Sequence, residues 1–305
     1  MTSIPILKQR GPCPRPKPDI IARLGRSIIQ HGPLSSRVYL MSLAPGDCPD
    51  IIPRLEKLAR ENSYTKIFAV VHAGAVPIFQ NAGYMVEAFV PGFFRGREGA
   101  GFMGYYLEET RGRPEDASLI QRVLKAAQSK GRTKTGFYPP HAYQVCPMDV
   151  SDIDDMATLY SRVFESYPFP VFDPRYLAET MQKNRAMYFG ARHEGRLAGL
   201  GAASKDMDSL SVELTDFAVL KEHRGKGLAG ALLGRMDLET RKMGMLTRYT
   251  IARATSYAMN TTFARAGYKF AGTLINNTHI AGKLESMNVW YRPVLQEGGS
   301  GINPP

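Results

Sequence analysis

Along most of this 305-residue chain, short apolar runs typical of strands alternate with segments in which apolar residues recur at helical spacing. Short apolar runs at residues 38–43 (VYLMSL) and 66–71 (KIFAVV) predict buried strands. Asp50 precedes apolar residues at helical spacing, which predicts a helix over residues 51–59. The same criteria predict a helix over 76–82, strands over 85–90 and 102–107, and a helix starting at Pro114. The first half is therefore expected to be mixed α/β.

The second half has a clearer order of elements. A strand over 143–148 precedes two helices, one capped by Ser151 and one opened by Asp173, and then three strands meander over residues 187–220. An amphipathic helix follows and stops at Gly244. The last predicted elements are that helix (228–243), a strand (246–252), a helix (257–266) and two closing strands (268–275 and 287–292).

The length allows about two average domains. The polar stretch 128–136, followed by Pro139 and Pro140, is the predicted domain boundary. The predicted segments are a basic, proline-rich arm (1–37), an amino-terminal α/β domain (38–135), a carboxy-terminal domain (141–292) and a flexible tail (296–305).

Composition and charge exclude several classes of protein. Hydrophobic residues at 44% and charged residues at 22% are typical of globular proteins, which excludes collagen, coiled coils and wholesale disorder. The net charge is +11, but more than half of the excess lies in residues 1–37, where Asp19 is the single acid. No aromatic-basic RNA-binding motif accompanies this segment. We therefore interpret it as a solvated arm and expect no nucleic-acid partner.

Membrane, disulfide and metal chemistry are not indicated either. No apolar run approaches the ~18 residues that span a bilayer, and residues 1–18 contain no signal-peptide core. The chain is thus expected to be cytoplasmic, with no membrane partner. Cys13, Cys48 and Cys146 are widely spaced and the histidines form no cluster, so we expect reduced thiols and no metal.

A faint internal repeat is present. Residues 79–84 (FQNAGY) and 263–268 (FARAGY) each follow an apolar strand and a short helix. A match this short has two interpretations. Either it arose by chance, or the first half is a degenerate copy of the second.

The most informative stretch runs from a strand through a glycine-rich loop into the amphipathic helix. Gly225 and Gly227 allow close approach of the backbone to a ligand, and the amides at a helix N-terminus favour an anion such as a pyrophosphate. The P-loop pattern is absent, and the antiparallel meander contradicts a dinucleotide-binding GxGxxG unit. The predicted anion-binding residues are Arg224, Gly225, Lys226, Gly227, Leu228, Ala229 and Gly230.

Here the sequence resembles the GCN5-related N-acetyltransferase (GNAT) superfamily, whose acetyl-CoA loop reads [RQ]xxGx[GA], as residues 224–229 do. The resemblance covers about residues 141–292. It implies a mixed, mostly antiparallel sheet flanked by helices, and it leaves open whether the first domain is a degenerate unit of the same kind. It also implies acetyl-CoA as cosubstrate, with further contacts from Phe217, Ala218, Val219, Asn260 and Phe263.

A narrower similarity covers nearly the whole chain. Residues 213–219 (ELTDFAV), 258–268 (AMNTTFARAGY), 285–291 (ESMNVWY) and 79–88 (FQNAGYMVEA) are similar to the beta-lysine N6-acetyltransferases. That family acetylates the terminal amine of (3S)-3,6-diaminohexanoate, and the product serves as a compatible solute. The similarity therefore implies a small-molecule amine as acceptor.

Transfer to an amine requires a base, because an amine with a pKa near 10 is mostly protonated at neutral pH. Glu213 is the first candidate, since the resemblance puts the base six positions before Val219; its other interpretation is a carboxylate that binds the substrate or pairs with an arginine. Asp216 falls on the opposite side of an ideal strand, so it could act as base or substrate-binding acid only if a bulge re-aims it.

The remaining roles are less determined. Phe263 stands where many superfamily members carry a tyrosine as general acid, and Tyr257 or water could replace it. The candidate substrate-binding residues are Thr215, Asn276, Asn277, Glu285 and Asn288. Two alternative functions stay open: acetylation of another amine, such as lysine, a polyamine or a protein lysine, and non-catalytic sensing of an acyl-CoA. The sequence does not give the oligomeric state.

Overall fold

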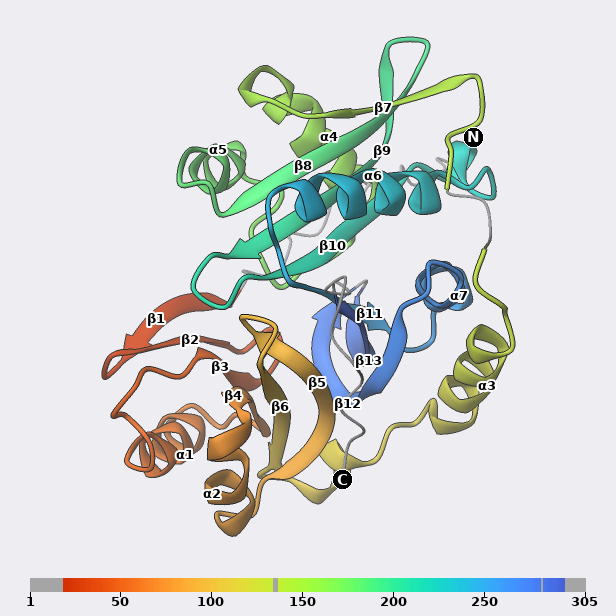
Figure 1. Cartoon of the computed structure of the whole chain (residues 1–305). Helices are drawn as coiled ribbons and strands as arrows, with labels where there is room; N and C mark the ends of the chain where they lie inside the picture. The colour runs from red at the N-terminus through yellow and green to blue at the C-terminus, as the bar shows by residue number, and fades with distance from the viewer. Residues whose placement is uncertain (1–18, 134–136, 281, 294–305) are drawn as a thin grey trace, which may run out of the picture.

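The computed structural model describes residues 19–133, 137–280 and 282–293, which form an α/β protein (Figure 1). The first half comprises β1 (Ile20–Leu24), β2 (Ser27–Gly32), β3 (Arg37–Ser42), α1 (Ile51–Glu61), β4 (Lys66–His72), α2 (Val76–Asn81), β5 (Met85–Phe94) and β6 (Glu98–Tyr106). Helix α3 (Ala117–Gln128) leads to the second half. That half comprises β7 (Tyr143–Pro147), α4 (Ile153–Val163), α5 (Pro174–Gln182), β8 (Ala186–His193), β9 (Arg196–Asp206), β10 (Ser211–Val219), α6 (Leu228–Lys242), β11 (Thr247–Arg253), α7 (Tyr257–Arg265), β12 (Lys269–Ile280) and β13 (Lys283–Pro293).

Local sequence signals explain most of the helix ends. The Asp173 carboxylate accepts a hydrogen bond from the Arg175 amide at 2.9 Å, so Asp173 caps α5 as predicted. Helix α6 ends before Gly244, which has a φ of +78°. The cap predicted at Ser151 is wrong. Asp149 accepts the Ser151 amide at 2.7 Å and forms a capping box with Asp152 at the turn that leads into α4.

The strands of the described residues form one sheet in the order β1-β2-β3-β4-β6-β5-β12-β13-β11-β10-β9-β8-β7. The order β1-β2-β3-β4-β6-β5 repeats as β8-β9-β10-β11-β13-β12. In each set the third and fourth strands are parallel and the other pairs are antiparallel. Helices α1 and α2 therefore correspond to α6 and α7. Strand β7 with α4 and α5 is extra to the second half.

The short sequence repeat has the same local structure in both halves. The Tyr84 amide donates to the Phe79 carbonyl at 3.1 Å, and the Tyr268 amide donates to the Phe263 carbonyl at 3.1 Å. The rings of each pair meet edge to face, with centroids 5.0 and 5.3 Å apart. The two halves are therefore copies of one structural unit, and the second interpretation of the repeat is confirmed.

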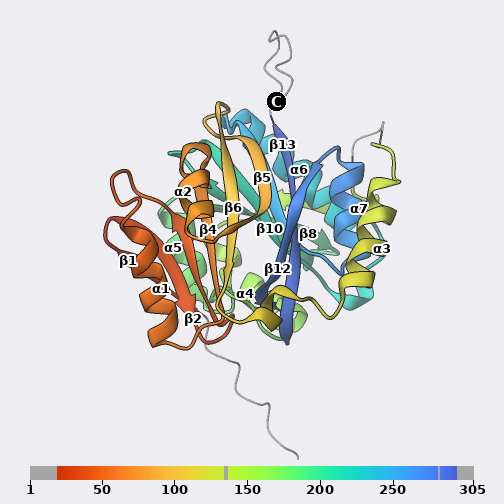
Figure 2. The same ribbon diagram turned by 90° about the horizontal axis from the view of Figure 1, so that it is seen from below.

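In the sheet order, each copy ends at the strand that faces the other copy. These two strands, β5 and β12, pair antiparallel, with Gly272 opposite Ala88 (Figure 2). Gly272 has a φ of +151°, and a Cβ atom built there would lie 2.1 Å from the Glu87 carbonyl oxygen. Only glycine allows the two backbones to approach so closely.

The predicted basic arm is wrong from residue 20 onward. Residues 20–24 and 27–32 form β1 and β2, and Ser27, Ile29 and Gln30 are buried. Pairing of β2 with β1 and β3, together with the burial of Ile29, outweighs the charge of the segment. Residues 1–18 and the predicted tail 296–305 lie outside the described residues.

The helices divide the apolar core into three clusters. Helices α1 and α2 cover a cluster centred on Leu55 and Phe79, whereas α6 and α7 cover one centred on Leu232 and Phe263. A third cluster joins both halves beneath α4 and α5. Helix α3, which the sequence places in the first domain, packs on α7 and adds Ala127 to the second cluster. No helix in the described part of the chain is long and apolar enough to cross a bilayer.

Candidate active site

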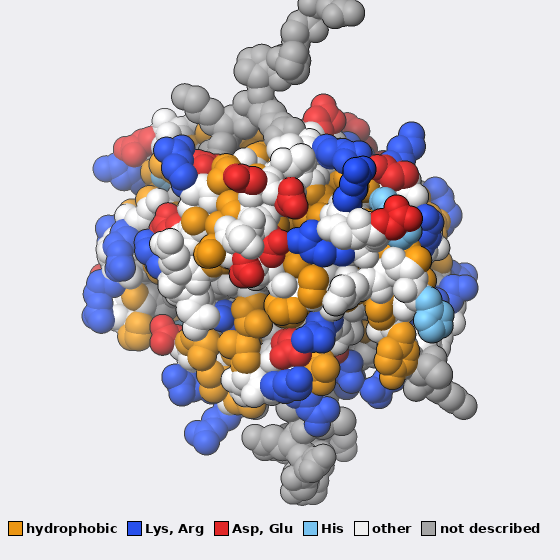
Figure 3. All heavy atoms as spheres, turned by 90° about the horizontal axis from the view of Figure 1, so that it is seen from above, with side chains coloured by type: hydrophobic (Ala, Val, Ile, Leu, Met, Phe, Trp, Pro, Cys, Tyr) orange, Lys and Arg blue, Asp and Glu red, His pale blue; other side chains and the backbone are white. Residues whose placement is uncertain are grey.

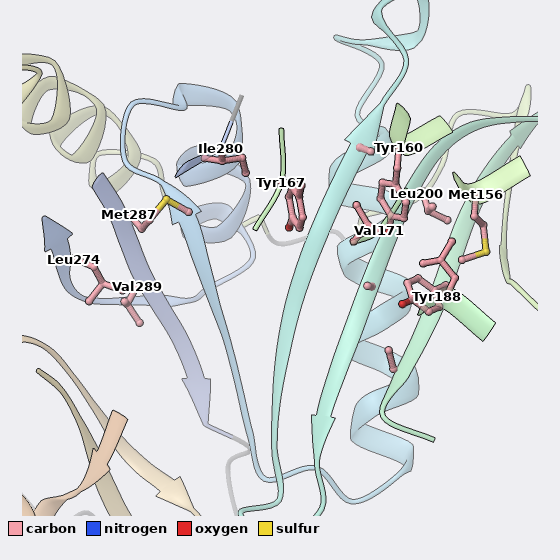
Figure 4. Packing of buried hydrophobic residues seen from close by; sticks show 14 of the residues in the cluster. Met156, Tyr160, Tyr167, Val171, Tyr188, Leu200, Leu274, Ile280, Met287 and Val289 are labelled. Atoms are coloured by element: carbon pink, nitrogen blue, oxygen red, sulfur yellow. The ribbon is translucent and has the colours of Figure 1, made fainter. Parts of the chain in front are cut away.

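The sheet opens where β10 and β11 separate. The two strands pair in parallel only from Ser211 to Glu213, whereas β10 stays paired with β9 as far as Val219. A cavity of about 930 Å³ lies at this opening and is lined by both halves of the chain. Figure 4 shows Tyr167 between Met287 and Leu200, which lie on opposite sides of the opening.

A β-bulge shapes the cavity wall. The register of β10 against β9 shifts between Thr215 and Ala218, and Asp216 has a φ of +55°. Glu213, Thr215, Asp216 and Phe217 therefore all line the cavity, although a regular strand would send Asp216 to the opposite face. The bulge that Asp216 needs in order to face the site is therefore present.

The two carboxyl groups at the bulge are electrostatically unusual. Burial, and next the charge of Asp216, raise the pKa of Glu213 to about 8, against the opposing effects of Arg37 and a hydrogen bond with Tyr249. Burial also raises the pKa of Asp216, while hydrogen bonds from Tyr167 and Thr215 favour its ionised form. Such a pair attracts a cation and can accept a proton from it.

The glycine-rich loop begins where β10 ends. Arg224 Nε donates to the Val219 carbonyl at 3.1 Å, which ties the loop to the strand. Gly225 and Gly227 have φ values of +77° and +78°, and among the described residues other than the chain neighbours no heavy atom lies within 4 Å of a Cβ built at either. The first amides of α6 follow, and helix geometry leaves them without helical partners. The loop therefore offers open backbone amides that fit a pyrophosphate.

Comparison with known proteins agrees with this geometry. Residues 153–268 match the Acetyltransferase (GNAT) family. A Beta-lysine N(6)-acetyltransferase from Methanococcus maripaludis is 33% identical over 277 residues, which cover 89% of this chain and 98% of the relative. The chain belongs to the beta-lysine N6-acetyltransferase family of the GNAT superfamily. N-acetyltransferase YodP from Bacillus subtilis is 29% identical and covers 87% of this chain and 95% of itself. A Beta-lysine N(6)-acetyltransferase from Methanosarcina mazei is 27% identical over 81% of this chain and 98% of itself.

The protein is therefore an N-acetyltransferase that acts on an amine, and its GNAT fold implies acetyl-CoA as the donor. In this acetyltransferase the opening of the sheet leaves the β11-facing edge of β10 unpaired at Phe217, Ala218 and Val219. Phe217 and Phe263 both line the cavity, with their rings edge to face and centroids 5.6 Å apart.

Asn260 and Asn288 are structural residues of the acetyltransferase core. Asn260 is fully buried, donates to the Arg253 and Ser256 carbonyls at 2.9 and 2.8 Å, and accepts from Asn288 and Trp290. Its amide has no donor or acceptor left for a cofactor. The Asn288 oxygen accepts from Thr273 at 2.8 Å, and its side chain is fully buried and does not line the cavity. The predictions that Asn260 binds cofactor and Asn288 binds substrate are therefore corrected.

Two more predicted substrate residues lie outside the cavity. Asn276 donates to the Arg111 carbonyl at 3.0 Å and borders a separate cavity of about 430 Å³. Glu285 is buried, accepts from Thr255 at 3.0 Å and pairs with Arg253 and Lys283. Both predictions are corrected by these partners. Thr215 and Asn277 do line the main cavity.

The first half lines the cavity with Phe93 and Phe94 on β5. It also contributes three residues that were not predicted from the sequence, Arg37 and Tyr39 on β3 and Phe68 on β4. The available signal was an arginine at the start of an apolar strand, because a charged residue in such a position needs a buried partner. The bordering tyrosines Tyr167 and Tyr249 carried no local signal.

Basic side chains do not gather into one patch on the face in Figure 3, where Lys and Arg alternate with Asp and Glu. Within the described ranges, no three His, Cys, Asp or Glu side chains form a group that could hold a metal ion.

Proposed function

We propose that this acetyltransferase transfers the acetyl group of acetyl-CoA to the N6 amine of beta-lysine and so makes N6-acetyl-beta-lysine, a compatible solute of the cytoplasm. The observation that carries the proposal is the cavity at the opening of the sheet, where Glu213 and Asp216 offer buried carboxyl groups to a cationic amine. Two relatives named Beta-lysine N(6)-acetyltransferase support this acceptor.

We assign the donor to the loop and the open edge of β10. The amides of residues 225–230 would bind the pyrophosphate, with Arg224 and Lys226 adding positive charge. The unpaired backbone at Phe217, Ala218 and Val219 would hydrogen-bond the amides of the pantetheine arm, as an added strand does. Phe263 would border that arm.

The proposed mechanism is direct transfer in a ternary complex. Asp216, held by Tyr167 and Thr215, attracts the ammonium group, and Glu213 removes one proton so that the amine nitrogen can attack the thioester carbonyl. The C–N bond forms and the C–S bond breaks. The nitrogen's second proton passes through water to the departing CoA thiolate, because Phe263 has no proton to give. Amides at the β10 bulge would stabilise the oxyanion.

An acceptor panel tests this function. Acetyl-CoA-dependent thiol release is measured with beta-lysine, α-lysine, spermidine and a histone-tail peptide. We expect a strong preference for beta-lysine, with mass spectrometry placing the acetyl group on N6. Preference for another amine would overturn the acceptor and leave acetyl transfer intact, and acetyl-CoA binding without any turnover would favour a sensor.

The loop assignment predicts the effect of Gly227→Ala. The added Cβ strains a residue at φ +78° and projects beside the amides assigned to the pyrophosphate, so we expect KM for acetyl-CoA to rise about tenfold. Gly244→Ala is the matched control, since Gly244 has the same φ, open space where the alanine Cβ would lie, and a position at the far end of the same helix. An equal rise in KM for both variants would show that strain alone is responsible.

A further inference from the structure

Arg37 is an unusual buried side chain in the wall of the cavity. It is 3% exposed, and its Nη1 donates to the Asn277 carbonyl at 2.7 Å and to Thr278 Oγ1 at 3.0 Å. Its Nη2 donates to Gln30 Oε1 at 3.3 Å. Its Nε has no hydrogen-bond partner among the residues that the structure describes. The guanidinium is thus held firmly from two sides and still has a free donor.

The charge of Arg37 is also uncompensated at close range. Among the described residues, no carboxylate oxygen lies within 4.0 Å of the Arg37 guanidinium nitrogens; Asp19, Glu213 and Glu87 act on it only from farther away. The neighbouring buried cation, Lys66, has the Glu87 carboxylate at 2.8 Å. A buried charge without a partner is costly, so an anion entering the cavity would be strongly favoured at Arg37.

Asn277 adds a second unmatched group beside Arg37. It is 1% exposed and lines the same cavity, and within the described part of the chain its Oδ1 has no hydrogen-bond partner. Aromatic rings complete the surroundings, with the Arg37 guanidinium carbon 5.2 Å from the Tyr39 ring centroid and 5.8 Å from that of Phe68. Both rings lie within cation–π distance of the guanidinium group.

We propose that Arg37 binds the carboxylate of the acceptor and that Asn277 accepts a hydrogen bond from its 3-amino group, so that the first half of the chain selects an amino acid over a simple diamine. The inference rests on the proposed function, whose base Glu213 lines the same cavity. An acceptor with a carboxylate and an amino group at one end contacts Arg37 and Asn277, and its terminal amine at the other end reaches Glu213. The degenerate copy thereby acts as the specificity half of the enzyme.

The test compares substrates that differ by one group. The substrate 1,4-diaminopentane is beta-lysine without its carboxylate, and 6-aminohexanoate is beta-lysine without its 3-amino group. We expect the parent enzyme to prefer beta-lysine over the diamine by about 100-fold in kcat/KM, and Arg37→Met to reduce that ratio to within about threefold of unity. Asn277→Ala should lower kcat/KM for beta-lysine and leave that for 6-aminohexanoate unchanged.

Arg111→Met is the matched control. Arg111 is also a buried arginine, and it donates to the Ser35 and Asn276 carbonyls where the two halves of the chain meet. It does not line the main cavity. We expect it to keep the parent's preference whatever it does to stability, because the ratio is independent of the folded fraction. If Arg37→Met does not fold, Arg37→Lys gives the answer, with an expected loss of at least about tenfold in the ratio.

An unchanged ratio in the Arg37 variants would overturn the inference, and so would a parent enzyme that acetylates the diamine as well as beta-lysine. Failure of the proposed function gives a different result. If the parent prefers α-lysine, the same variants are compared on α-lysine and 1,5-diaminopentane, and loss of that preference still supports Arg37 as the carboxylate site.

Discussion

Glu213→Gln is expected to lower kcat about 1000-fold, while the Kd for acetyl-CoA stays within about twofold of the parent value. Glutamine keeps the shape of the side chain and its contact with Tyr249, but it cannot take a proton from the amine. Steady-state kinetics and calorimetric titration with acetyl-CoA measure the two quantities. A variant that keeps more than a tenth of parent kcat would show that Glu213 is not the base.

The pH dependence should report the same group. The pKa of Glu213 is raised to about 8, so the carboxyl group is mostly protonated at pH 7 and becomes a base as the pH rises through 8. We expect kcat/KM to rise through this range, with a break near pH 8 that Glu213→Gln lacks. Asp216→Asn should move the break to lower pH, because a like charge that raises the pKa is removed. A break that persists in Glu213→Gln belongs to another group.

Most helices and strands could be predicted from the sequence because their patterns are local. Apolar runs and caps set β4, α6 and the start of α5 within one or two residues. Strands β1 and β2 were missed because the excess of positive charge in residues 1–37 was interpreted as a solvated arm. In the fold, β1 forms the edge of the sheet, contains Arg23 as its one charged residue, and leaves Ile20 and Ile21 exposed.

In the candidate site, too, the residues that are close together in the sequence could be predicted, and those that depend on strand pairing could not. Glu213, Asp216 and the loop from Arg224 belong to one continuous stretch, so sequence order alone brings them together. Asn260 and Glu285 were assigned from nearby motifs, and their actual partners depend on which strands pair.

Arg37 and Asn277 could not be found together from the sequence. They lie in different copies of the repeat and meet only because β5 pairs with β12. A long-range contact of this kind leaves no periodic signal.

The second large prediction concerns stability and the contacts that β12 makes with β4 and β5 of the first half. Lys66 is fully buried, and its Nζ lies 2.8 Å from Glu87 Oε2 and 2.7 Å from the Ile275 carbonyl oxygen. Glu87 in turn accepts from the Ile275 amide at 2.8 Å and from Tyr106. The Lys66–Glu87 ion pair, on β4 and β5 of the first half, thus hydrogen-bonds both the backbone carbonyl and the backbone amide of Ile275 on β12.

Lys66→Met is therefore expected to lower the free energy of unfolding by about 3–5 kcal/mol, because it leaves the Glu87 carboxylate and the Ile275 carbonyl buried without the cation. Urea unfolding followed by circular dichroism measures the change. Lys57→Met is the control: Lys57 is exposed, its Nζ lies 3.8 Å from Glu61, and its loss should cost no more than about 0.5 kcal/mol.

The double variant Lys66→Met with Glu87→Gln separates charge from packing. Glutamine can still accept the Ile275 amide and the Tyr106 hydroxyl, but it brings no buried charge. If the uncompensated carboxylate causes the loss, the double variant should be more stable than Lys66→Met alone. A double variant that is less stable than Lys66→Met would show that the uncompensated carboxylate is not the cause of the loss. The loss would then come from the hydrogen bond that Lys66 Nζ donates to the Ile275 carbonyl, because methionine keeps the volume of the side chain and has no donor.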